Sequence, residues 1–98
     1  MKFHIVAVKD ELTNAFLQPT YADDERAIIR IFDYQINNTP IWKDNPADFS
    51  LWHIGLFYQE TGQIEPDLYK ICSGTSVWRK EKDNDLQSVD TTDKAKNA

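Results

Sequence analysis

The stretch from Phe49 to Gly62 constrains the fold more than any other part of the chain. Its sequence, FSLWHIGLFYQETG, holds four of the twelve aromatic residues. It predicts a strand from Phe49 to Tyr58, a hairpin turn over residues 59–63 and a returning strand from Ile64 to Cys72. Gly62 suits the turn because glycine adopts positive φ without a steric penalty. Gly55, inside the first strand, predicts a β-bulge or a close backbone approach.

The N-terminal segment predicts a second hairpin. Residues 3–8 carry apolar side chains on both faces, which is typical of a strand inside a sheet: residues 3, 5 and 7 share one face, and residues 4, 6 and 8 share the other. Residues 10–14 form a polar turn, and Ala15 to Gln18 predict a short strand. Pro19 ends that strand because proline has no N–H to donate.

A single amphipathic helix is predicted after this hairpin. Asp23 or Asp24 supplies the N-cap, and acidic residues in the first turn complement the helix dipole. The sequence at residues 37–40, Asn-Asn-Thr-Pro, ends the helix. One stripe follows helical spacing and is expected to pack on the sheet; it consists of Ile28, Ile31, Phe32, Gln35 and Ile36.

The remaining segments complete an α+β fold of order β-β-α-β-β: an antiparallel sheet of about four strands with one helix on one face. Residues 41–50 predict a linker containing one helical turn that begins at Pro46. Pro66 predicts an edge position or a bend in the last strand. We expect one domain over residues 1–78. Residues 79–98 lack aromatic residues and are expected to form a disordered charged tail.

Composition and charge exclude several classes of function. The net charge of −5 provides no overall basic field for nucleic acid or an anionic membrane. The apolar run at the N-terminus is too short for a signal peptide or a membrane span, so we expect a soluble intracellular protein. The lone Cys72 predicts a buried structural thiol, and His4 and His53 predict partly exposed sheet residues. We therefore expect no enzyme activity, no metal and no cofactor.

One helix covers only one face of such a sheet, so the other face is either solvated or covered by a partner. Strict alternation places Trp52, Ile54, Leu56 and Tyr58 on one face of the third strand. Aromatic side chains on an open sheet face can stack single-stranded bases, although the core is the default expectation for at least half of them. The candidate residues for nucleic-acid or partner binding are Trp52, Tyr58, Tyr69, Arg26, Arg30, Lys70, Arg79 and Lys80.

The order of several short motifs carries a resemblance. They are FLQP at residues 16–19, AIIRIF at 27–32, WKDNPADFSL at 42–51, IGLF at 54–57 and ETG at 60–62. Together they resemble the nonstructural protein of gokushovirus-type microviruses, the small single-stranded DNA bacteriophages that also infect Chlamydia and Spiroplasma. Asn45 and Tyr58 depart from that family, in which histidine and an acidic residue, respectively, are frequent at these places. The resemblance covers residues 3 to about 74.

This resemblance implies a phage protein that is absent from the virion and acts in the host cytoplasm. The implied role is non-enzymatic and lies in viral genome replication, in single-stranded DNA synthesis or its hand-over to packaging. The implied partner is single-stranded DNA or a phage or host replication protein. The alternative is a protein–protein interaction module that uses the open sheet face or a strand edge, to self-associate or to bind a host factor.

Overall fold

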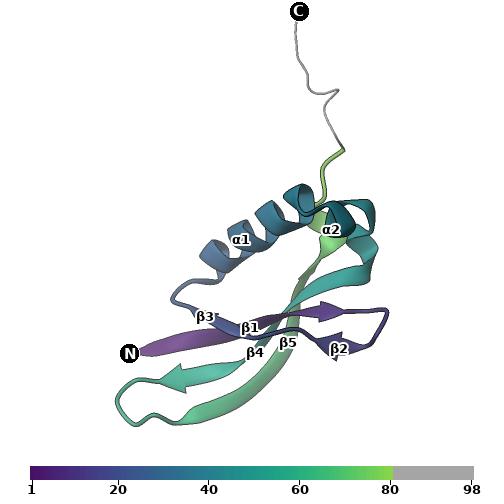
Figure 1. Ribbon diagram of the computed structural model, residues 1–98. Coiled ribbons are helices and arrows are strands. Elements are labelled where there is room, and N and C mark those ends of the chain that lie inside the picture. The colour runs from purple at the N-terminus through teal and green to yellow at the C-terminus, as the bar shows by residue number, and fades with distance from the viewer. Residues whose placement is uncertain (81–98) are drawn as a thin grey trace, which may run out of the picture.

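The computed structural model describes residues 1–80, which form one antiparallel sheet with helices on one side (Figure 1). The central strand β1 (Lys2–Asp10) pairs with β4 (Phe49–Tyr58) along one edge, and β5 (Ile64–Ser73) pairs with β4 at the outside. Two short strands, β2 (Ala15–Phe16) and β3 (Thr20–Ala22), share the other edge of β1. The predicted antiparallel sheet with a helix across one face is confirmed.

The strand β3 is the element that the sequence did not predict. The strand β2 ends at Phe16, two residues before the predicted end at Gln18. After Pro19 the chain returns to β1 and pairs Thr20 with Val6 and Ala22 with His4. This pairing is available because β1 is nine residues long and β2 occupies only its last two positions. The sheet therefore has five strands rather than about four.

The helix α1 (Glu25–Asn38) begins and ends where its caps predict. The Asp24 side chain accepts a hydrogen bond from the Arg26 backbone N–H at 2.9 Å. That bond lowers the pKa of Asp24; desolvation opposes it, and the Arg26 charge adds to it. At the other end, Thr39 N–H donates to the Gln35 carbonyl, and Pro40 prevents the helix from continuing.

The core lies between α1 and the sheet. It consists of Ile28, Phe32 and Ile36 from the helix and Val6, Phe49 and Leu51 from the strands. Ile31, which the helical spacing placed in the packing stripe, is 53% exposed. The apolar stripe of α1 is wider than the part of the sheet that α1 contacts, so Ile31 lies over the edge of the sheet.

The connection between α1 and β4 is more helical than expected. Pro40 ends α1 but also occupies the first turn of a second helix, α2 (Pro40–Asp44), a position that suits its fixed φ. The predicted turn at Pro46 is present as a 3₁₀ turn, η1 (Pro46–Asp48). The Trp42 ring stacks on Phe49 at 4.6 Å between centroids and ties this connection to the core.

A further short helix, α3 (Gly74–Val77), follows β5 and was not predicted. The buried Gly74 lies against the Pro46 carbonyl of η1. Arg79, expected at the start of the tail, donates from its backbone to Asn37 Oδ1 and from its guanidinium to Asp33 on α1. The predicted disorder of residues 81–98 lies outside the described residues.

Gly55 marks the predicted bulge and changes which side chains share a face. Between the pairs Val6–His53 and Ile5–Gly55 the register shifts, so Ile54 has no partner on β1. A Cβ at Gly55 would lie 2.6 Å from the Glu65 carbonyl oxygen, which confirms the close approach. The hairpin turn is confirmed as well, with Gly62 at φ 76°.

The bulge makes the expected aromatic face wrong. Trp52 pairs with Ala7 and Tyr58 pairs with Lys2. Directly paired residues share a face, whereas positions 7 and 2 of β1 alternate onto opposite faces. Trp52 and Tyr58 therefore lie on opposite sides of the sheet, because the extra residue at the bulge shifts the two-residue alternation of side chains between the faces.

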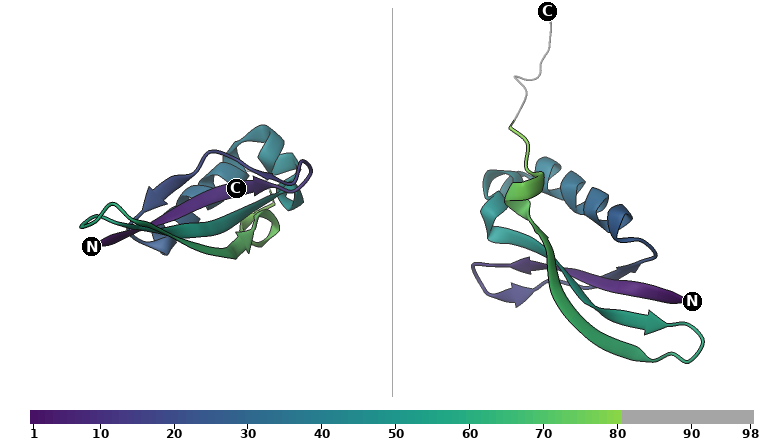
Figure 2. Two further views of the ribbon diagram at one scale, coloured as in Figure 1. Left: turned by 90° about the horizontal axis from the view of Figure 1, so that it is seen from below. Right: turned by 180° about the vertical axis from the view of Figure 1, so that it is seen from behind.

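The face of the sheet away from α1 is uncovered within residues 1–80. The helices α1, α2 and α3 gather on one side, and the view from below shows the strands with the helices behind them (Figure 2). We call the uncovered side the open face.

Substituting Gly74 tests the close packing of α3. In Gly74→Ala the new Cβ would lie 2.1 Å from the Pro46 carbonyl oxygen and 3.0 Å from the Phe49 carbonyl oxygen. We expect the free energy of unfolding, measured by urea denaturation, to fall by about 3 kcal/mol. Gly62→Ala, which meets open space but carries positive φ, should cost about 1 kcal/mol. Equal losses in the two variants would contradict the tight contact at Gly74.

Candidate nucleic-acid interface

The open face is defined by alternation along β1 and by the cross-strand partners of those residues. Residues 3, 5, 7 and 9 of β1 point to it. Their neighbours on β2, β3 and β4 extend the face, and β5 adds the partners of β4. The aromatic and basic members are Phe3, Lys9, Phe16, Tyr21, Trp52, Phe57 and Lys70.

One end of the open face carries a cluster of Lys9, Phe16 and Trp52, which we call the Trp52 cluster. The Phe16 and Trp52 rings meet edge to face at 5.8 Å, and Lys9 Nζ lies 5.7 and 5.3 Å from their centroids. The Trp52 indole N–H donates to Ser50 Oγ at 2.8 Å, which fixes the ring. Lys70 pairs directly with Trp52 across the strands. Two cations and two aromatic rings therefore lie together.

The acidic charge of the chain is concentrated elsewhere. Asp24, Glu25 and Asp33 belong to α1, while Glu65 and Asp67 bond toward the helix side of the sheet. The strand residues paired onto the open face include Lys9 and Lys70 and no acid. Glu11, which follows β1, is the carboxylate nearest to Lys9, at 3.9 Å. Glu11 also accepts from Ser50 Oγ, so this end of the open face has one carboxylate beside two lysines. With one acid against two bases, the open face is more basic than the net charge indicates.

The structure brings together only two of the eight candidate residues, Trp52 and Lys70. Tyr58 points to the opposite face of the sheet, the helix side, and its hydroxyl donates to Glu65 at 2.8 Å. This bond to Glu65, together with desolvation, raises the pKa of Tyr58. Tyr58 is therefore beside an acid rather than beside a base.

The other candidates lie on the helix side or at its end. Arg26 and Arg30 project from α1 into solvent, with Arg26 beside Asp24. Arg79 is bound to Asp33, and Lys80 is the last described residue. They do not form one surface with Trp52.

Tyr69 also lies on the helix side, stacked on His53 with ring centroids 4.5 Å apart. Its hydroxyl donates to Glu25, and this hydrogen bond together with desolvation raises the pKa of Tyr69 to about 12. This bond joins β5 to the first turn of α1, although Tyr69 itself is 40% exposed.

Sequence reasoning missed Lys9, Phe16 and the three aromatic residues at the other end of the face. A signal was present for Lys9, because it continues the alternation of Phe3, Ile5 and Ala7 by one step. Tyr21 had no such signal, since its place on the face depends on β3.

The two histidines form a pair within the fold. His53 is 1% exposed rather than partly exposed, because Tyr69 covers its ring and His4 bonds to it. Its Nδ1 contacts the Asp67 carbonyl at 2.7 Å and must donate, since a carbonyl only accepts. In the neutral pair, Nε2 of His53 then accepts from Nδ1 of His4 at 2.9 Å. Within residues 1–80, no cluster of three metal-ligating side chains is present.

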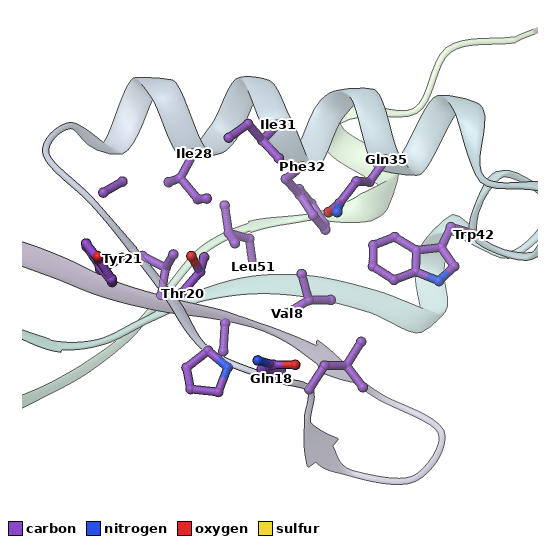
Figure 3. A pocket seen from close by; sticks show the side chains of 15 residues that line it. Val8, Gln18, Thr20, Tyr21, Ile28, Ile31, Phe32, Gln35, Trp42 and Leu51 are labelled. Atoms are coloured by element: carbon purple, nitrogen blue, oxygen red, sulfur yellow. The ribbon is translucent and has the colours of Figure 1, made fainter.

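A concave surface, which we call the helix-side groove, lies between α1 and the edge of β1. Ile28, Ile31, Phe32 and Gln35 point into it from the helix, with Trp42 at one end (Figure 3). Its volume is about 520 Å³, and its lining has no charged side chain.

Cys72 packs against the core and is half-buried. Burial raises the pKa of its thiol.

These features define an α+β protein with an aromatic, partly basic open sheet face. A model of the Phage ORF5 protein family matches residues 3–77, so the chain belongs to this family of bacteriophage proteins. No curated protein and no solved structure matches the chain. Among the described residues, no helix has the length and apolar character that crossing a bilayer requires.

The Tyr69–Glu25 bond predicts a specific loss of stability at high pH. Below about pH 10 the phenol is protonated in both states, so its contribution to stability is fully present. As the pH rises from about 10 to 12, the unfolded phenol ionises first and the contribution is lost. Urea denaturation at stepped pH should therefore show a steeper decline for the wild type than for Tyr69→Phe. Tyr34→Phe, at a tyrosine that is 68% exposed, is the control and should follow the wild type.

Proposed function

We propose that this phage protein binds single-stranded DNA on its open face and acts in viral genome replication. The resemblance to microvirus nonstructural proteins supports a role in single-stranded DNA synthesis or its hand-over to packaging. The proposed role is non-enzymatic and belongs to the host cytoplasm rather than the virion. One observation carries the DNA contact: the Trp52 cluster places two aromatic rings beside Lys9 and Lys70 on an uncovered sheet.

The chemistry of the cluster suits an unpaired nucleotide. A base has a π-face that can stack on Phe16 or Trp52, and stacking contributes about 1–3 kcal/mol per base. In the free protein the Lys9 ammonium lies over these rings. A stacked base takes that place, and the ammonium moves to the phosphate beside it. Lys70 provides the second phosphate contact from the neighbouring strand.

The small number of cations sets the expected salt dependence. Each phosphate contact to single-stranded DNA adds about −0.7 to the slope of log K against log salt, so two contacts give about −1.4. Affinity should then fall about sevenfold between about 50 and 200 mM salt. Stacking on Phe16 or Trp52 requires an unpaired base, which favours single-stranded over duplex DNA.

Phe16→Ala tests the stacking step. Phe16 is 42% exposed, so its loss disturbs the core little. We expect anisotropy titration with a labelled oligonucleotide of about 12 nucleotides to show binding that is weaker by about 5- to 150-fold. Leu17→Ala is the matched control, since Leu17 is 40% exposed and lines the helix-side groove. No binding of the wild type at low salt would refute the DNA contact.

Lys70→Gln tests the phosphate contact. Removing one of two contacts should reduce the salt slope by about 0.7 while leaving the fold unchanged. Arg30→Gln removes an equal charge from the outer side of α1 and should leave the slope unchanged. Equal effects of the two substitutions would show that net charge, and not the open face, determines binding.

A second candidate function is a protein-interaction module that self-associates. It is favoured by the apolar groove beside α1, which exposes Ile31 and Leu17 and has no charged side chain in its lining. A second copy of the chain would cover these side chains. Within residues 1–80 the outer edge of β5 has no partner strand, and it offers another surface for such a contact.

Sedimentation velocity over a range of concentrations tests self-association. If copies meet at the groove, Ile31→Glu should shift the population to monomer, because it places a charge in an apolar contact. Ile64→Glu, at a residue that is 65% exposed on the distant hairpin tip, should leave the dimer intact. A strict monomer at every concentration would exclude this candidate.

A further inference from the structure

We propose that the groove formed by Phe3, Tyr21 and Phe57 is a second base-binding subsite for single-stranded DNA. The inference rests on the proposed function and extends it, because it assigns an occupant to the far end of the open face. We call this groove the Tyr21 groove; it is lined by Phe3, Ile5, Pro19, Thr20, Tyr21, Phe57 and Gln59.

Three neighbouring strands build the Tyr21 groove. Phe3 on β1 pairs with Phe57 on β4, and Ile5 pairs with Tyr21 on β3, so the aromatic rings come from adjacent positions of one face. The Phe3 and Tyr21 rings meet at 5.5 Å between centroids with an angle of 60°. Tyr21 is 67% exposed and leaves its ring available for contact. The groove has a volume of about 460 Å³.

The lining of the Tyr21 groove favours a nucleobase over other occupants. It has no charged side chain, so it does not bind a phosphate group directly. Its polar groups, from Thr20, Tyr21 and Gln59, can hydrogen-bond to the edge of a planar ring. A purely apolar side chain would leave these groups without partners, which costs free energy on burial. A base can stack on the aromatic side chains and also hydrogen-bond to the polar groups at the rim.

The position of the groove relative to the Trp52 cluster fits one DNA strand that crosses the sheet. Phe3 and Lys9 lie six residues apart on β1, which corresponds to about 20 Å at about 3.3 Å per residue. Both point to the open face, with Ile5 and Ala7 between them. The cations lie at the Trp52 end, so a short oligonucleotide binds there first. Only a longer one reaches the Tyr21 groove as well.

Tyr21→Ala, measured with oligonucleotides of two lengths, tests the second subsite. For a strand of about 16 nucleotides we expect affinity to fall about fivefold or more, since one stacked base is lost. For a strand of about 2 nucleotides, which is too short to span the two subsites and binds at the Trp52 cluster, the change should stay below about twofold. Tyr34→Ala is the matched control because Tyr34, on α1, is 68% exposed. Gln59→Ala, at an exposed turn residue, repeats the test at the polar rim.

The outcomes separate this inference from the proposed function. If neither oligonucleotide binds the wild type, both fail. If both bind and neither Tyr21→Ala nor Gln59→Ala weakens the longer one, only the second subsite is overturned. A Phe57→Trp reporter gives an independent readout with Trp52 intact: its added fluorescence should be quenched by the longer strand and not by the shorter one.

Discussion

The packing of one helix against one face of the sheet determines the rest of this structure. Ile28, Phe32 and Ile36 on α1 contact Val6 and Leu51, and these side chains form the centre of the core. A helix has one apolar stripe of this kind, so it can bury one side of a sheet only. In the described part of the chain, no helix or strand covers the opposite side, although it carries aromatic rings from four strands. The proposed binding surface is a direct consequence of this one-sided core.

The bulge at Ile54 decides which rings reach that surface. A strand without it would place Trp52 and Tyr58 on the same side, with Phe57 on the other. The unpaired Ile54 instead places Phe57 with Trp52 and moves Tyr58 next to Glu65. One residue without a side chain, Gly55, permits this change because the Glu65 carbonyl occupies the space of a Cβ. Backbone irregularity thus determines the chemical character of each face.

The sequence predicts best where the signals are local. The cap at Asp24, the proline turn at Pro46 and the glycine turn at Gly62 were all predictable, because each depends on neighbouring residues. The strand β3 was not, since three residues with no strand pattern of their own pair with a distant segment. The burial of His53 was missed because it requires Tyr69 from another strand above its ring. Of the residues in the proposed site, Trp52 and Lys70 were predicted from the sequence, whereas Phe16 and Tyr21 needed the register of β1.

The anchoring of Arg79 has a practical consequence for handling the protein. Its bonds to Asp33 and Asn37 fix the chain against α1, on the side of the sheet opposite to the Trp52 cluster. A label attached at position 80 therefore lies on the rear of the molecule. Immobilisation at that position would turn the aromatic rings toward the solution, whereas attachment at Met1, beside the hairpin tip, would crowd them.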